Sequence, residues 1–171
     1  MIATLEATAP CRLELIGGRL EPAADPSLDA VPRLAVAVDR RVLCRVEPRE
    51  SGIEIHVKDS GERIIAEDAR ELLSGPFTRV ARILVAASVT AGIRVVTHVK
   101  VPKDAGLGAD GAEEVALLAA LGLNSAGTSV PLPADLADSD RQAALFGGAH
   151  ALRRRNGTTS VDRVKSDPAR L

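Results

Sequence analysis

Hydrophobic and polar residues change their spacing several times along the chain, and each spacing predicts a structural element. Apolar residues alternate with polar ones over 12–16, which is typical of a half-buried strand. Apolar runs over 34–46 and 53–57 predict two more strands, separated by a turn at 48–52. We therefore expect these two to pair as antiparallel neighbours, with a further strand over 61–65.

The middle of the chain has helical spacing. Apolar residues over 77–91 predict a helix that packs on the sheet and stops at Gly92. Residues 93–99 are rich in β-branched side chains and predict a strand. A second helix is predicted over 111–121, with Gly122 directly after it. A strand, a glycine-containing loop and a helix are thus expected in succession.

The remaining segments have weaker patterns. Residues 20–32 contain three prolines, which predicts a loop. A short helix is predicted over 134–145. Two strands, over 149–154 and 159–164, are expected to form a hairpin around the Asn-Gly pair at 156–157.

Composition narrows the class of protein. With 171 residues, 46% of them hydrophobic, the chain can bury a core as one globular unit. Its 22 basic residues are balanced by 23 acidic ones, and it has two Phe and no Tyr or Trp. Nucleic-acid binding needs a basic surface and aromatic residues on which bases stack, so this class is disfavoured.

The two cysteines, Cys11 and Cys44, lie inside apolar strand-like runs. We expect them to be small buried side chains in a reducing compartment, with no disulfide or zinc site. The N-terminus lacks a signal-peptide pattern, and no run reaches the ~20 apolar residues that span a bilayer. A cytoplasmic protein that does not interact with membranes is therefore expected.

The clearest chemical signal is the segment 101–112, VPKDAGLGADGA, which leads into the second predicted helix. Gly106, Gly108 and Gly111 leave backbone open where a ligand can touch it. The helix start would direct unpaired N–H groups and the positive end of its dipole at an anion. The alternative is an ordinary strand-to-helix turn without a ligand.

Two motifs in order resemble those of the GHMP kinases. Pro102 followed by Gly106-Leu107-Gly108 is similar to the second motif of that family, and Ala9-Pro10-Cys11-Arg12, followed by Gly17-Gly18, is similar to the first. The sugar-kinase branch that contains fucokinases and heptose phosphate kinases is the most similar, since Glu21 follows the glycine pair and a strand returns to Asp39-Arg40.

This resemblance implies the fold class and the domain organisation. It predicts an α+β fold of the ribosomal protein S5 domain 2 type, with a mixed sheet and helices packed on one face. Residues 1–171 would form one GHMP kinase N-terminal-like domain, and the C-terminal GHMP domain would be absent from this chain. A homodimer, or a separate chain that carries the C-terminal domain, is then the expected protein partner.

The resemblance also implies an ATP-dependent kinase for a sugar or sugar phosphate, with ATP and Mg²⁺. Asp140, before the stretch that ends in Phe146-Gly147-Gly148, matches the residue that takes the proton from the acceptor hydroxyl, and Arg12 would lie beside it. Arg12, Gly17, Gly18 and Glu21 would bind the substrate. The nucleotide would be bound by Pro102, Gly106, Leu107, Gly108, Ala109, Asp110, Gly111 and Ala112.

Each of these residues also has a plainer interpretation. Asp140 would cap or solvate a surface helix. Arg12 would form a strand-edge ion pair with Glu14 or Glu21, and Glu21 would be an exposed loop carboxylate.

Two departures from the family pattern bear on function. Ala109-Asp110 replaces the Ser-Ser that follows Gly-Leu-Gly in these kinases. Asp110 would either bind Mg²⁺ or cap the helix, and we favour the cap. The metal-holding glutamate before the catalytic aspartate has no counterpart at a matching place, and neither Glu113 nor Glu114 can be assigned to that role. The metal ligands stay unassigned, and a catalytically degenerate domain that binds a ligand or a partner is the alternative function.

Overall fold

The computed structural model describes residues 4–17, 33–102, 104–123, 138–155 and 158–165. In chain order the elements are β1 (Leu5–Ile16), β2 (Arg33–Pro48), β3 (Ile53–Val57), β4 (Arg63–Ala66), the 3₁₀ helix η2 (Ala69–Leu72), α1 (Thr78–Ala86), β5 (Ile93–Val99), α2 (Ala109–Ala120), α3 (Asp138–Phe146), β6 (Ala149–Arg155) and β7 (Thr158–Val164). The predicted loop 20–32, the hairpin turn 156–157 and residues 134–137 of a predicted helix lie outside the described residues.

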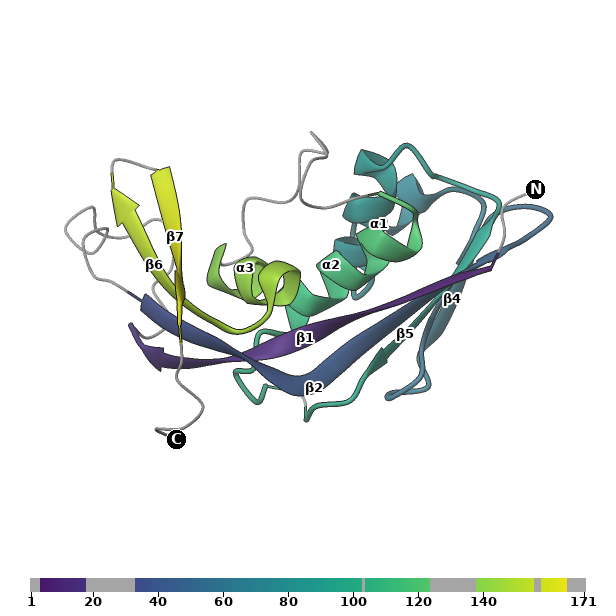
Figure 1. Ribbon diagram of the computed structural model, residues 1–171. Coiled ribbons are helices and arrows are strands. Elements are labelled where there is room, and N and C mark those ends of the chain that lie inside the picture. Colours follow the sequence, from purple (N-terminus) through teal and green to yellow (C-terminus); the bar gives the residue numbers. More distant parts are fainter. Residues whose placement is uncertain (1–3, 18–32, 103, 124–137, 156–157, 166–171) are drawn as a thin grey trace.

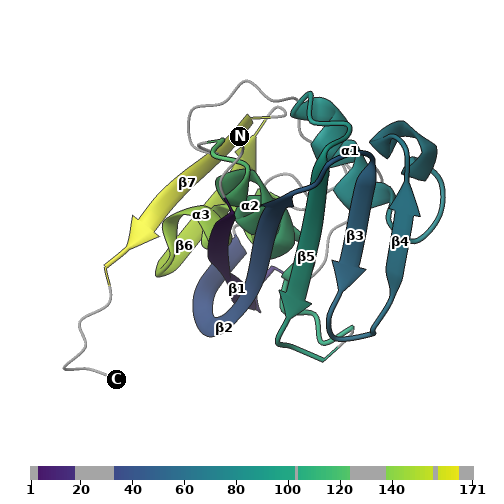
Figure 2. The same cartoon turned by 90° about the vertical axis from the view of Figure 1, so that its right-hand side faces the viewer.

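One mixed sheet forms a layer, and the helices cover one of its faces (Figure 1). The strand order is β4-β3-β5-β2-β6-β7, and β1 pairs with β2 (Figure 2). All pairs are antiparallel except β3 with β5, which is parallel. The predicted α+β class, with helices on one face of a mixed sheet, is confirmed.

The long strand β2 organises the sheet because different partners use its two halves. Its first part, residues 33–36, pairs with β6, and its last part, residues 42–48, pairs with β5. Strand β1 pairs along both parts, with a register shift between Pro10 and Cys11. Irregularities of this kind bend a strand and redirect its side chains. Arg12, which is part of the site described below, is the second residue after the shift.

The predicted pairing of β2 with β3 is wrong, because β5 lies between them. The turn that joins the two strands opens onto the start of β5. Arg49 donates its backbone N–H to Gly92 at 2.9 Å, and Gly92 donates to the carbonyl of Gly52 at 2.6 Å. These bonds hold β2 and β3 apart at the width of one strand, which β5 fills.

The core lies between the sheet and the helices. Helix α1 faces it with Val80, Ala81, Ile83 and Leu84, and α2 with almost its whole length. The largest fully buried apolar side chains are Ile53, Ile55, Ile83, Leu84, Ile93, Leu117, Leu118, Val42, Val46 and Val95. Burial of this much apolar surface is the main source of stability for such a domain.

Helix α1 ends earlier than predicted. It stops at Ala86, and Ser88 takes a left-handed conformation with φ of 57°. Val89 then donates its backbone N–H to the carbonyl of Leu84 at 3.0 Å, which is the bond of a Schellman cap. The predicted stop at Gly92 is therefore wrong, since a serine adopts the conformation that glycine usually supplies. Gly122, with φ of 74°, follows α2 as predicted.

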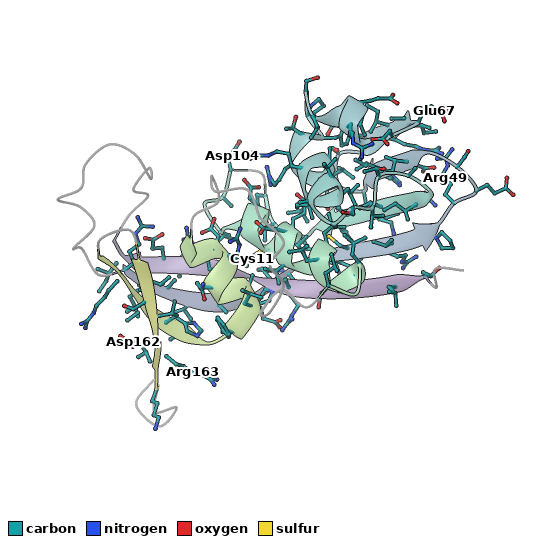
Figure 3. The ribbon with its side chains drawn as sticks, turned by 90° about the horizontal axis from the view of Figure 1, so that it is seen from above. Cys11, Arg49, Glu67, Asp104, Asp162 and Arg163 are labelled. Carbon is teal, nitrogen blue, oxygen red and sulfur yellow. The ribbon has the colours of Figure 1, made fainter. Side chains whose placement is uncertain are left out.

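Both cysteines are free and buried, as predicted. Figure 3 shows Cys11 on β1 beneath the helices. Within the described residues no helix has the length and hydropathy to cross a membrane.

Candidate active site

Three segments far apart in the sequence meet at one point: β1, the loop before α2, and α3. The Nε of Arg12 donates a hydrogen bond to Oδ1 of Asp140, across 128 positions of sequence. Gly108 lies against both, because a Cβ placed on it would be 2.9 Å from Cγ of Arg12 and 2.9 Å from Cγ of Asp140. The fold thus brings together the two residues predicted to be catalytic and the glycine loop.

Strand β1 holds Arg12 at this point through its backbone as well. The N–H of Arg12 donates to the carbonyl of Leu107 at 2.8 Å, which ties the strand to the glycine loop. The guanidinium also contacts Oε2 of Glu14 at 2.9 Å. The side chains of Arg12, Glu14 and Asp140 are all largely buried, with 9%, 11% and 14% exposed. Arg12 therefore pairs with the predicted catalytic carboxylate and also with Glu14.

The loop turns into α2 through left-handed glycines. Gly106 has φ of 69° and Gly108, the N-cap of α2, has φ of 64°, a region that other residues rarely adopt. No side chain caps the helix at Gly108. The first N–H groups of a helix have no partner within it, so this end of α2 has the polarity that an anion requires.

The close approach of α3 explains why residue 111 is glycine. A Cβ on Gly111 would lie 2.5 Å from Cβ of Asp140 and 2.9 Å from the backbone nitrogen of Arg141. Real Cβ atoms do not approach so closely, so α3 can cross here only over glycine. Space around Gly106 is open within 4 Å. Gly111 thus makes room for Asp140 rather than for a ligand, while Gly106 is needed for its φ.

The predicted helix cap by Asp110 is wrong. Gly108 is the N-cap, and Asp110 lies in the first turn with its side chain 56% exposed. Its Oδ1 accepts a hydrogen bond from Nη1 of Arg79, which reaches over from α1. The same Nη1 lies 3.4 Å from Oε2 of Glu113. The negative charge that departs from the family motif is therefore met by a nearby arginine.

Several solved kinases share this fold. The D-glycero-D-manno-heptose 1-phosphate kinase from Bacteroides thetaiotaomicron is 20% identical, with a TM-score of 0.75, over 95% of this chain and 60% of the kinase. The Methanococcus jannaschii mevalonate kinase is 14% identical, with a TM-score of 0.70, over 96% and 56%. The Lactococcus lactis galactokinase, solved with galactose, is 14% identical, with a TM-score of 0.67, over 95% and 47%.

The fold is that of the GHMP kinase N-terminal domain. The chain spans between 47% and 60% of the length of these three kinases. No protein-family model and no curated protein matches it. At identities of 14–20% the likeness establishes the fold, and the chemistry has to be argued from the site.

The GHMP-fold site has further predicted residues near the end of β1. Gly17 follows the strand with φ of 119°, and a Cβ on it would lie 3.1 Å from Oε1 of Glu14. Gly17 is thus close to the carboxylate that contacts Arg12. Gly18 and Glu21, predicted to bind the substrate, lie outside the described residues. Pro102 is exposed, whereas Ala112 is buried in the core.

Two buried glutamates on α2 were not predicted to have a structural role. Glu114 is fully buried, and its Oε1 lies 2.7 Å from Nη2 of Arg141 on α3. Burial raises the pKa of Glu113, and the charge of Asp110 raises it further, against the opposing charge of Arg79. The available signal was the Glu-Glu pair itself, because a charged pair within an otherwise apolar helix needs partners on neighbouring elements.

Cys11 lies next to the site. Burial raises the pKa of its thiol, and the negative charge of Asp140 raises it further. Burial also raises the pKa of Cys44, with a smaller contribution from Glu113. Neither thiol is therefore activated as a nucleophile, since a reactive cysteine requires a lowered pKa.

Proposed function

We propose that this chain is the catalytic domain, or the N-terminal half, of an ATP-dependent kinase that acts on a sugar or sugar phosphate in the cytoplasm. The observation that carries the proposal is the meeting of Arg12, Asp140 and Gly108. A carboxylate, an arginine and the start of a helix are the groups that in-line phosphoryl transfer to a hydroxyl requires.

The proposed roles are supported by the geometry. The backbone N–H groups at the start of α2 would bind the triphosphate of ATP, whose charge matches the helix dipole. Asp140 would accept the proton of the acceptor hydroxyl as that oxygen attacks the terminal phosphorus. Arg12 would orient the carboxylate of Asp140 through their hydrogen bond. The solved heptose phosphate kinase and galactokinase point to a sugar as the acceptor class.

The protein ligands of the expected Mg²⁺ are not assigned. No group of three His, Cys, Asp or Glu residues gathers in the part of the chain that the structure describes. The two aspartates near the loop, Asp110 and Asp140, are each paired with an arginine. No catalytic step is therefore assigned to a metal ligand of this chain.

A protein partner is proposed to bind this end of β1, either a separate chain or a second copy of this one. Leu13, Leu15 and Ile16 follow Arg12 along β1 with 45%, 54% and 58% of their surface exposed. Apolar surface of this kind supports association. Light scattering should give a mass above that of a monomer, either alone or with the partner. A monomer whose Leu15→Asp variant behaves identically would count against this.

The second candidate function is a degenerate domain that binds a ligand or a partner without turnover. Ala109 and Asp110 favour it, because a carboxylate stands where the kinases have a hydroxyl. The ion pair with Arg79 also places a competing anion at the start of α2.

Calorimetry with ATP and Mg²⁺ separates these functions. Binding accompanied by phosphoryl transfer to a sugar or sugar phosphate supports the kinase, and binding without transfer supports the degenerate domain. Absence of ATP binding by the wild type removes the kinase function. The Ala109→Ser, Asp110→Ser variant should bind ATP several-fold more tightly, because it restores hydroxyls and removes a like charge. Glu67→Ser, a change on the exposed surface away from the loop, is the control.

A further inference from the structure

Helices α2 and α3 are joined at two neighbouring points on one face of α2. At the first point, Gly111 lets the backbone of α3 pass at Asp140. One turn later along α2, Oε1 of Glu114 lies 2.7 Å from Nη2 of Arg141. Residues three apart on a helix lie on the same face, so the two contacts act on the same stretch of α3. That stretch holds Asp140 and the residue directly after it.

The ion pair between Glu114 and Arg141 is buried. The glutamate side chain has no exposed surface, and the arginine side chain is 22% exposed. A buried ion pair adds little net stability, because desolvation of both charges offsets their attraction. Loss of Arg141, however, leaves the buried carboxylate of Glu114 with one charge partner fewer, which the surrounding structure must move to accommodate. Such a contact fixes where two elements lie relative to each other.

We infer that Glu114 and Arg141 are positioning residues, which hold Asp140 against Arg12 and the glycine loop. This rests on the proposed kinase function in so far as Asp140 is the catalytic carboxylate. The helix whose start would bind the triphosphate also holds the helix that carries Asp140, through this pair. The distance between the start of α2, where phosphate would bind, and Asp140 is thereby fixed by the packing of the two helices. Substrate is not needed to set it.

Cys11 gives a reporter of this geometry that does not depend on activity. Its thiol pKa is raised by burial and then by the charge of Asp140, so withdrawal of that carboxylate lowers the pKa. In a Cys44→Ala background, Cys11 is the only thiol. Its ionisation can then be followed by the ultraviolet absorbance of the thiolate during a pH titration. Asp140→Asn in the same background sets the size of the expected change.

Three variants test the inference in this background. Arg141→Gln should lower the pKa of Cys11 in the same direction as Asp140→Asn, because loss of the contact between Glu114 and residue 141 lets α3 move. The charge exchange Glu114→Arg with Arg141→Glu should return the titration toward the wild type. If the exchange variant does not fold, Arg141→Lys takes its place, and its titration should lie between those of the wild type and Arg141→Gln. Arg94→Gln, which breaks contacts with Glu47 and Glu54 on the sheet, is the control and should leave the Cys11 titration unchanged.

The activity measurement adds a separate readout. Where the wild type transfers phosphate, Arg141→Gln should lower kcat about tenfold to a hundredfold while KM for ATP stays nearly constant, because a displaced base affects the chemical step. Recovery of kcat in the exchange variant supports positioning.

The inference is overturned if Arg141→Gln leaves the Cys11 titration unchanged while Asp140→Asn shifts it. It is also overturned if Asp140→Asn has no effect, since Asp140 is then not held where the structure places it. A wild type without phosphoryl transfer refutes the proposed kinase function alone, and the titration still decides the positioning of Asp140.

Discussion

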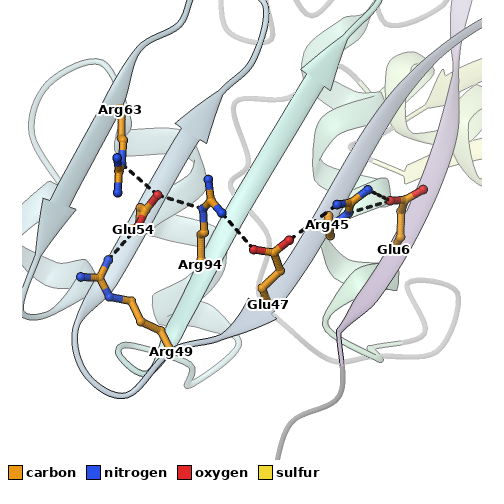
Figure 4. Close-up of polar contacts among 7 residues, drawn as sticks. All are labelled: Glu6, Arg45, Glu47, Arg49, Glu54, Arg63 and Arg94. Carbon is orange, nitrogen blue, oxygen red and sulfur yellow. Dashed lines mark hydrogen bonds and ion pairs between the residues drawn. The ribbon is translucent and has the colours of Figure 1, made fainter.

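Arginine–carboxylate contacts occur in two regions of this molecule, and they differ in what holds them together. The first region is a ladder across the sheet face opposite the helices (Figure 4). It contains Arg63, Glu54, Arg49, Arg94, Glu47, Arg45 and Glu6. The second is the candidate site, where Arg12 meets Asp140 and Glu14. The chemistry of the pairs is the same, but their surroundings are not.

In the ladder the contacts join side chains on the same or neighbouring strands, except that Arg49 reaches Glu54 from the turn after β2. Arg94 contacts Glu47 at 3.2 Å, and the two residues are cross-strand partners in the register of β2 with β5. Alternation along each strand is enough to place such residues on one face. Several of the arginines are well exposed, so solvent screens their interactions. Loss of one contact should therefore leave the others in place.

In the site the contacts depend on the tertiary fold. Arg12 and Asp140 come from β1 and α3, and the fold brings them together only with glycine at 108 and 111. Both side chains are largely buried. The arginines of the ladder thus obtain their carboxylate partners mainly through strand pairing, whereas Arg12 obtains Asp140 through long-range packing. Substitutions should separate the two regions by the size and kind of their effect.

The largest expected effect is that of Asp140→Asn. The amide keeps the shape of the side chain but cannot take the acceptor proton, so the rate of phosphoryl transfer should fall about 10²–10⁴-fold. ATP binding measured by calorimetry should stay close to that of the wild type. Glu47→Gln, in the ladder, should leave both quantities unchanged. Transfer by the Asn variant at the wild-type rate would remove Asp140 from the mechanism.

The next effect is that of Gly111→Ala, which tests packing rather than charge. The added Cβ would meet Cβ of Asp140 at 2.5 Å, so α3 must shift. We expect a loss of about 1–3 kcal/mol in the free energy of unfolding, the usual cost of an extra group in a packed interior. Gly122→Ala is the comparison. Nothing lies within 4 Å of a Cβ added there, so only the φ of 74° disfavours alanine. Urea unfolding measures both, and activity should fall in the first alone.

The comparison also shows what the sequence predicts and what it does not. Apolar runs, β-branched residues and one alternating segment predicted most strands, and the glycine loop between a strand and a helix predicted the order of β5 and α2. The position of β5 between β2 and β3 was not predictable, because the period of a strand does not specify its neighbour. The early end of α1 was missed because Ser88 takes a left-handed conformation that serine rarely adopts.

Within the site, the resemblance to GHMP kinase motifs implied that Arg12 lies beside Asp140, and the structure brings both together at the glycine loop. The partner of Asp110 could not be found this way, since Arg79 lies 31 positions away on another helix. The burial of Glu114 was missed for the same reason, because its partner Arg141 belongs to α3. Contacts between helices depend on crossing geometry, which a single sequence does not encode.

Glu54 in the ladder gives a further test, because the stability that it contributes should depend on pH. Burial alone raises the pKa of Glu54, but the hydrogen bond from Arg63 and the charges of Arg94 and Arg49 outweigh it, so the pKa lies below the ordinary 4.5. A lowered pKa in the folded state contributes stability above the unfolded pKa and loses it as the pH falls through the folded value.

Glu54→Gln should therefore lower the free energy of unfolding at pH 7 by about 1 kcal/mol, a modest figure because its arginines are partly exposed. The difference from the wild type should shrink below about pH 4.5. Urea unfolding across this range measures it, with the more exposed Glu47→Gln as a weaker control. A difference that stays constant with pH would mean that the carboxylate charge is not the cause.

Glu113 on α2 should behave in the opposite sense, with the smallest effect. Its pKa is raised, mainly by burial, so its folded pKa lies above the unfolded value of 4.5. Such a group contributes stability below the unfolded pKa and loses it as the pH rises through the folded pKa. Glu113→Gln, which stays neutral, should be slightly more stable than the wild type at pH 7. That gain should disappear below about pH 4.5.

The Glu113→Gln variant leaves Arg79 paired with Asp110, so the substitution does not create an isolated charge. Thermal unfolding at both ends of the pH range measures the effect. A Gln variant that is less stable at pH 7 would mean that the 3.4 Å contact with Arg79 outweighs the cost of burial. Glu113 would then behave like Glu54. Burial would not explain why carboxylates on the two sides of the sheet differ in their contribution to stability.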